Sequence, residues 1–183
     1  MIWPRAVFER IGLFDAELVR NQDDELSYRL RKAGGRIFIT TRMQSSYQNR
    51  QSIRTLARQF FQYGVWKIRV LQKHPKQMSP RHFVPPVFVL ALAVTAVGAP
   101  IVPLSGWLCA AIAMAYVSAL SAATVQVARQ HGWRHVPLVL LVFVVMHVAW
   151  GSGFLVGAAR FAGRWRSQEP LPERLAGAPA SMP

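Results

Sequence analysis

Hydrophobic and polar positions follow two different patterns in this chain, and the change between them comes near residue 82. Residues 83–128 and 135–159 contain no Asp, Glu, Lys or Arg, whereas charged side chains recur throughout residues 1–82. A helix needs about 20 apolar residues to cross a hydrocarbon core. The pattern therefore predicts a membrane segment over residues 83–159, with three transmembrane helices at about 83–104, 107–128 and 136–157.

Prolines and one glycine indicate where the first two spans begin and end. Pro85 and Pro86 suit the first turn of a helix, where a missing N–H leaves no hydrogen bond unmade. Pro100 and Pro103 suit the end of the first span, and Gly106 lies in a short uncharged link. We therefore expect the first two spans to form a helical hairpin.

Residues 51–82 predict a basic amphipathic helix, from Gln51 to His74, with Ser52 as its N-cap. Gly64 interrupts it and indicates either a kink or close packing. The apolar side chains share one broad face: Ile53, Leu56, Phe60, Tyr63, Val70 and Leu71. The basic side chains share the opposite arc: Arg54, Arg58, Arg69, Lys73 and Lys76. This pattern fits a helix packed on a soluble domain, but the membrane spans nearby favour an interfacial helix on an anionic bilayer.

Residues 1–50 predict shorter elements. Pro4 precedes a short helix over residues 5–10, and a second helix runs from Asp24 to Ala33, where two glycines end it. Residues 36–40 have the composition of a strand, and residues 44–47 of a second extended piece. The predicted fold is mostly α with a small β component, and residues 160–183 form a disordered tail rich in proline.

The start of the second helix carries three consecutive carboxylates, Asp23, Asp24 and Glu25. Asp23 fits an N-cap, and the helix dipole favours negative charge there. Leu26 and Leu30 are four residues apart and predict a buried face. One interpretation is a capped surface helix with solvated charges. The other is that a rigidly held carboxylate opens onto a cleft and acts as a general base.

The formal net charge of +14 and the isoelectric point of about 11.5 raise the question of nucleic-acid binding. The basic residues flank apolar spans, and no helix-turn-helix or zinc-ligand pattern occurs, so we expect no nucleic-acid partner. The positive-inside rule instead places residues 1–82 in the cytoplasm, as part of a multi-pass membrane protein.

Basic residues after the spans give conflicting indications of topology. Arg129 and Arg134 follow two spans and agree with a cytoplasmic location. Arg160, Arg164 and Arg166 follow the third span, and three full crossings would place them outside. Either the third segment is not a simple span, or the tail departs from the rule.

Two runs of residues resemble a known family. Residues 5–15, ending in Gly-Leu-Phe-Asp, and residues 21–34 resemble the second half of the catalytic domain of family 2 glycosyltransferases. Within that family the chain resembles membrane-attached bacterial exopolysaccharide enzymes of the succinoglycan type, which implies a location in the bacterial inner membrane. The family's Glu-Asp pair reads Gln22-Asp23 here. The resemblance implies the C-terminal remnant of a GT-A α/β domain, with Asp23 as catalytic base and Gln22 and Asp24 as supporting neighbours.

A later motif of the family has a changed counterpart. Processive members carry Gln-x-x-Arg-Trp on an interfacial helix, and this chain has Gln59, Gln62 and Tyr63 at the corresponding positions. The resemblance implies that these side chains support the donor or acceptor site. The loss of Arg and Trp favours transfer of a single sugar over processive synthesis.

The resemblance implies inverting transfer of a sugar from a nucleotide sugar to an acceptor hydroxyl, commonly on a polyprenyl lipid. The family uses Mg²⁺ or Mn²⁺ for the departing diphosphate, but its Asp-x-Asp motif is absent, so we expect no metal ligands in this chain. We expect a truncated enzyme that is inactive alone and needs a separate N-terminal half. The alternative is a non-catalytic membrane protein whose basic helix anchors it to anionic lipid or docks a partner.

Overall fold

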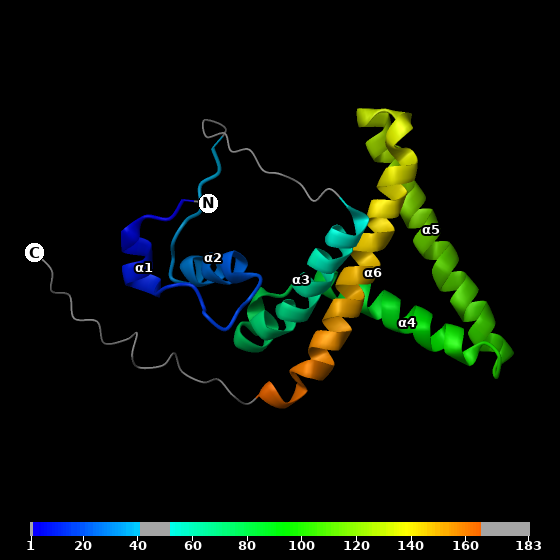
Figure 1. The fold of residues 1–183 in the computed structure, drawn as a ribbon, viewed down its shortest axis with the longest axis horizontal. Helices are drawn as coiled ribbons and strands as arrows, with labels where there is room; N and C mark the ends of the chain where they lie inside the picture. Colours follow the sequence, from blue (N-terminus) through cyan, green and yellow to red (C-terminus); the bar gives the residue numbers. More distant parts are fainter. Residues whose placement is uncertain (1, 41–51, 166–183) are drawn as a thin grey trace, which may run out of the picture.

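The computed structural model describes residues 2–40 and 52–165. These residues form helices without a strand, so the prediction of a mostly α chain is confirmed and the small β component is not. The principal helices are α1 (Arg5–Ile11), α2 (Gln22–Lys32), α3 (Ile53–Lys73), α4 (Val84–Gly98), α5 (Pro103–His131) and α6 (Val136–Arg160). Short 3₁₀ turns are η1 (Pro75–Gln77), η2 (Pro80–Phe83), η3 (Trp133–His135) and η4 (Ala162–Arg164). Figure 1 places α1 and α2 on one side of α3, and α4, α5 and α6 on the other.

Helix α2 begins one residue before Asp23, which corrects the prediction of Asp23 as N-cap. The N-cap is Asn21, whose left-handed backbone (φ 65°) an asparagine tolerates better than most residues. Asp23 is consequently the second residue of the helix. The predicted stop at the glycines is confirmed, because the Gly34 and Gly35 amides donate to the Arg31 and Leu30 carbonyls in a Schellman arrangement.

The segment predicted as a strand, residues 36–40, is extended chain without a partner strand. Phe38 and Ile39 are 85% and 97% exposed. A strand must pair its N–H and C=O groups with a neighbour, and none of the described residues supplies one. Residues 44–47 lie outside the described part of the chain.

Helices α3 and α6 lie side by side and run in the same direction (Figure 1). Gly64 faces the backbone of Trp150 and Phe154, Gly153 faces that of Phe61, and Gly157 faces that of Val65. Glycines let two helix backbones approach closely, as small residues do in membrane helix pairs. Of the two predictions for Gly64, close packing is therefore the one that the structure bears out.

Three helical stretches are long and apolar enough to cross a membrane: Pro80–Gly98, Pro103–His131 and Trp133–Arg160. This confirms a membrane protein. The link between the first two helices covers only residues 99–102, since Pro103 opens α5 instead of ending the first span, and Gly106 lies within α5. A proline fits a first helical turn as well as a position beyond a helix end, which is why its placement was misread. Ser105 Oγ still donates to the Thr95 carbonyl across the hairpin.

The end of α6 lies beside the N-terminal part of the chain. Gln72 of α3 donates to the Phe161 carbonyl at 2.8 Å, and Arg164 Nη1 lies 3.5 Å from a Glu17 carboxylate oxygen. Residues 160–165 are therefore structured, which corrects the predicted start of the tail, while residues 166–183 lie outside the described part. This placement favours the interpretation in which the third segment is not a simple crossing.

Candidate functional site

A small polar hollow lies where the loop before α2 meets α3. Its volume is about 230 Å³. The lining contains Asp23 and the residues just before it on one side, and Tyr63 of α3 on the other; the full set is Phe14, Val19, Arg20, Asn21, Gln22, Asp23 and Tyr63. Two segments that are forty residues apart in sequence thus form one cavity.

Three hydrogen bonds fix the geometry of this hollow. Gln59 Nε2 donates to the Tyr63 hydroxyl at 2.7 Å, which holds the phenol ring along α3. Arg20 Nε donates to Gln62 Oε1 at 3.1 Å. Asn21 Nδ2 donates to the Tyr63 carbonyl at 3.1 Å. Gln62 and Tyr63, which are predicted to support the site, therefore contact the loop that precedes Asp23, while Gln59 contacts Tyr63.

Gln22 lies in the lining but points its amide toward the preceding turn. Its Nε2 donates to the Asp15 carbonyl at 3.3 Å, which fixes the entry into α2. The Asp15 carboxylate in turn accepts from the Glu17 amide and pairs with Lys73. Gln22 thus positions the loop.

Asp23 differs from the other carboxylates that the structure describes. Glu9 pairs with Arg5, Asp15 and Glu17 with Lys73, Asp24 with Lys67, and Glu25 with Arg29. Within residues 2–40 and 52–165, the Asp23 side chain has no ion pair and no hydrogen bond. Its exposed carboxylate is therefore free to accept a proton or a hydrogen bond from a molecule in the hollow.

Asp24 has a different role from the one expected of a neighbour in the site. It lies outside the lining of the hollow, and its Oδ2 accepts from Lys67 Nζ at 2.5 Å. Lys67 is 7% exposed, and a buried ammonium needs such a partner. Asp24 therefore fastens α2 to α3.

The predicted basic stripe of α3 is neutralised over its second half. Arg69 is only 3% exposed and pairs with Glu17 at 2.6 Å, and Lys73 lies 2.8 Å from the same residue. These two side chains contact acidic side chains of the N-terminal segment, as expected for the alternative of a helix packed on a soluble domain. Arg54 and Arg58, in the first turns of α3, are exposed. The interfacial interpretation rests on these two residues.

Glu25 is a buried acid that sequence reasoning did not single out. It is 2% exposed and accepts from Arg29 Nε at 2.7 Å and Nη2 at 2.9 Å, while His74 Nε2 lies 2.8 Å from its Oε1. Burial disfavours its charge, but the hydrogen bonds and charges of His74 and Arg29 outweigh this and lower its pKa. The acid-to-arginine spacing of four residues was the one available sequence signal.

The described residues do not form a metal site. No group of three or more His, Cys, Asp or Glu side chains among them gathers closely enough to hold an ion. Asp23 is a single unpaired carboxylate, whereas Mg²⁺ and Mn²⁺ need several oxygen ligands. The divalent cation expected for the full-length family therefore finds no ligand set in this part of the chain.

Sequence comparison identifies one bacterial relative. The chain is 31% identical over 147 residues to the succinoglycan biosynthesis protein ExoA of Rhizobium meliloti (strain 1021). The match covers 80% of this chain and 43% of that protein, so the chain spans less than half of its relative's length. No family model and no solved structure matches the chain. The match supports the predicted resemblance to the C-terminal part of an exopolysaccharide enzyme of this type.

Proposed function

We propose that this chain is the C-terminal part of a membrane-attached, inverting family 2 glycosyltransferase that acts in exopolysaccharide synthesis. It would move one sugar from a nucleotide sugar to a lipid-linked acceptor. The similarity to a succinoglycan biosynthesis protein supports the class, and the three apolar helices support a site beside the bilayer. The single observation that carries the proposal is the Asp23 carboxylate in a polar hollow, which has no partner among the described residues, whereas the other described carboxylates are paired.

Asp23 is the base in this reaction. Its carboxylate accepts the proton of the acceptor hydroxyl while that oxygen attacks the anomeric carbon, and the nucleoside diphosphate leaves from the opposite face. The position of Asp23 in the first turn of α2 suits the role, because the helix fixes the carboxylate and the neighbouring acids are already neutralised by Lys67 and Arg29. A base held in this way needs no rearrangement at the moment of reaction.

Tyr63 and its two glutamines position the substrate. Tyr63 lines the hollow together with Asp23, and its hydroxyl already accepts from Gln59. The phenol O–H therefore remains available to donate to a sugar oxygen. Gln62 holds Arg20 at the hollow, where its guanidinium can contact a phosphate.

Neither a metal ligand set nor a nucleotide-binding half is found among the described residues, and the chain matches 43% of its relative's length. A divalent cation supplies charge neutralisation at the diphosphate in such enzymes. We propose that these parts come from the remainder of a longer protein or from a separate N-terminal half, and that residues 2–165 do not transfer sugar alone.

The test is sugar transfer by the chain completed with a nucleotide-binding half in bacterial membranes. Asp23→Asn should lower transfer about a hundredfold or more, because general bases contribute rate factors of this size. Glu9→Gln is the control, since Glu9 is an exposed acid on α1 whose one ion pair is with Arg5. Both variants must reach the membrane in equal amounts. Undiminished transfer by Asp23→Asn would rule out the assignment of the base.

A non-catalytic anchor is the second candidate. The exposed Arg54 and Arg58 favour it, because two cations at the start of α3 that have no ion pair among the described residues can bind anionic lipid head groups. The ion pairs of Arg69 and Lys73 weaken it, since they leave fewer cations for lipid. Binding to anionic vesicles without any transfer by the completed protein would favour the anchor.

A further inference from the structure

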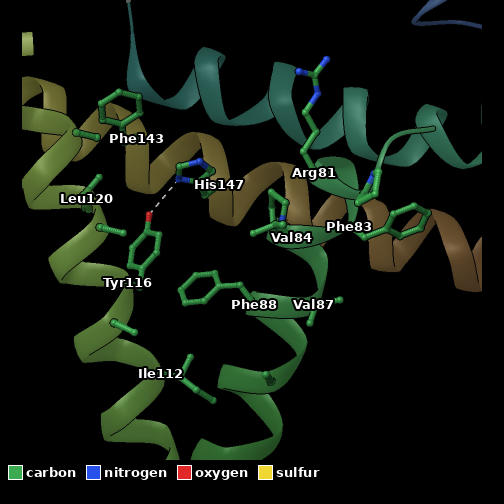
Figure 2. Close-up of a pocket in the computed structure, with 16 residues that line it drawn as sticks. Arg81, Phe83, Val84, Val87, Phe88, Ile112, Tyr116, Leu120, Phe143 and His147 are labelled. Carbon is green, nitrogen blue, oxygen red and sulfur yellow. Dashed lines mark hydrogen bonds between the residues drawn. The ribbon is translucent and has the colours of Figure 1, made fainter. Parts of the chain in front are cut away.

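A second and much larger cavity lies among the membrane helices. Its volume is about 1000 Å³, and residues of η2, α4, α5 and the first half of α6 line it. Figure 2 shows Arg81 at one end, the rings of Phe88 and Tyr116 across the middle, and Ile112 at the far end. Helix geometry puts residue 91, the last lining position on α4, about 15 Å along from Arg81. We call this cavity the α4–α5 groove.

The walls of the α4–α5 groove suit hydrocarbon. Phe88 and Tyr116 stack with their ring centroids 4.4 Å apart and form a flat apolar surface. Apart from Arg81, the polar side chains in the lining are Tyr116 and His147, and these lie within hydrogen-bonding distance of each other, Oη to Nδ1, at 3.2 Å. Because the two polar groups satisfy one another, an alkyl chain can enter without leaving either unpaired.

Arg81 gives one end of the groove a positive charge. The residue is exposed, and within the part of the chain that the structure describes its guanidinium has no hydrogen bond or ion pair. The neighbouring His82 feels the charges of Arg81, Lys67 and Asp24, and Asp24 already pairs with Lys67. A phosphate is the natural partner for a free guanidinium at this position.

The charge pattern argues against a helix from a second copy in the groove. The candidate membrane helices, Pro80–Gly98, Pro103–His131 and Trp133–Arg160, contain no acidic residue, so a second copy inserted there would offer Arg81 no counter-charge. A lipid provides both an alkyl chain for the apolar walls and a phosphate for Arg81.

We propose that the α4–α5 groove binds the isoprenoid chain of a lipid phosphate, with the phosphate held by Arg81. The identity of this lipid as the acceptor carrier rests on the proposed function. In that arrangement the head group lies beside η2, and Lys67 and Asp24 connect this point to the α2 helix start that carries Asp23. The isoprenoid chain then lies in the α4–α5 groove, and the sugar on its phosphate extends toward the polar hollow.

The test is photo-crosslinking of the 183-residue chain in phosphatidylcholine nanodiscs. The probe is a polyprenyl phosphate with a diazirine on its chain, and the crosslinked residues are found by mass spectrometry. Labelling should fall on α4 and α5 residues of the groove. Arg81→Gln should lower the yield about tenfold at limiting probe, as expected for loss of a charged hydrogen bond. Ala119→Trp, which places an indole inside the groove, should abolish it.

Two matched variants serve as controls. Arg129 is an exposed arginine near the end of α5, and Ala111 is an exposed alanine two turns before Ala119; neither lines the groove. Arg129→Gln and Ala111→Trp should leave the yield unchanged, and circular dichroism melting should show that all four variants are folded.

Four outcomes would overturn the proposal: equal labelling by the phosphate-free polyprenol, equal competition by phosphatidylglycerol, crosslinks between two copies, or equal loss in the control variants. Because no sugar transfer is measured, this result is independent of the Asp23 experiment. Labelling can succeed while transfer fails, and the reverse.

Discussion

The close contact between α3 and α6 predicts that a methyl group added at Gly64 destabilises the protein. A Cβ built on Gly64 lies 2.2 Å from the Trp150 carbonyl oxygen and 2.7 Å from the Phe154 nitrogen. Both are backbone atoms of α6, so no side chain can swing aside. The Gly64→Ala substitution therefore forces the two helices apart by about 1 Å.

The cost follows from two opposing effects. Overpacking a well-packed interface costs about 1–3 kcal/mol, and a backbone clash belongs at the upper end of this range. Alanine returns about 1 kcal/mol of helix propensity. We expect a net loss of about 2 kcal/mol in the free energy of unfolding, which raises the unfolding constant more than tenfold.

Gly106→Ala is the matched control, because it makes the same chemical change within α5. Its built Cβ finds the Ala99 Cβ at 3.8 Å, an ordinary contact. Here the helix propensity acts alone, and we expect a gain of up to about 1 kcal/mol. The same substitution should thus have opposite signs at the two positions.

The assay is unfolding of the detergent-solubilised protein by titration with sodium dodecyl sulfate, followed by circular dichroism. A further check is Gly153→Ala, whose Cβ would meet the Phe61 carbonyl oxygen at 2.1 Å. Once one alanine has moved the helices apart, the second should cost little free energy. The variant with both Gly64→Ala and Gly153→Ala should therefore lose less stability than the sum of the losses in the two single variants. If Gly64→Ala is as stable as Gly106→Ala, α3 and α6 do not pack as described.

Two further predictions concern the buried acid and the end of α6. The pKa of Glu25 is lowered in the folded protein, so its charge stabilises the fold above the unfolded pKa of 4.5. This contribution is lost as pH falls through the folded pKa, so the melting temperature should fall on acidification. Glu25→Gln should flatten this pH dependence. Cysteines introduced by Arg164→Cys and Lys76→Cys should react with a membrane-impermeant maleimide from the same side of the membrane, because Arg164 lies 3.5 Å from Glu17. Labelling of the two variants from opposite sides would contradict the placement of α6.

The sequence was sufficient for the helices, because local signals define them. The amphipathic period and Ser52 predicted α3, and the structure confirms that Ser52 Oγ accepts from the Thr55 amide. The two glycines after Ala33 predicted the end of α2 for the same reason, since they supply the conformation that a helix end needs. These signals depend on neighbours in sequence.

The ion pairs could not be predicted in this way. Whether Arg69 faces lipid or Glu17 depends on how residues 15–25 approach α3, and no local pattern records that approach. The burial of Glu25 has the same origin. The packing of α6 did leave a signal, since Gly153 and Gly157 form a small-xxx-small pair that indicates a close helix neighbour. The strand prediction at residues 36–40 was wrong because composition cannot supply a partner strand.

Helix α3 links the polar hollow to α6 through residues 63–67. Tyr63 lines the polar hollow, Gly64 contacts the backbone of α6, and Lys67 holds Asp24. Because Tyr63 and Gly64 are adjacent residues of one rigid helix, a shift of α6 that moves Gly64 also moves Tyr63 relative to the Asn21 amide that bonds its carbonyl. The geometry of the hollow therefore depends on how α6 packs against α3, which explains why Asn21 and Gly64 have to be considered as parts of one site.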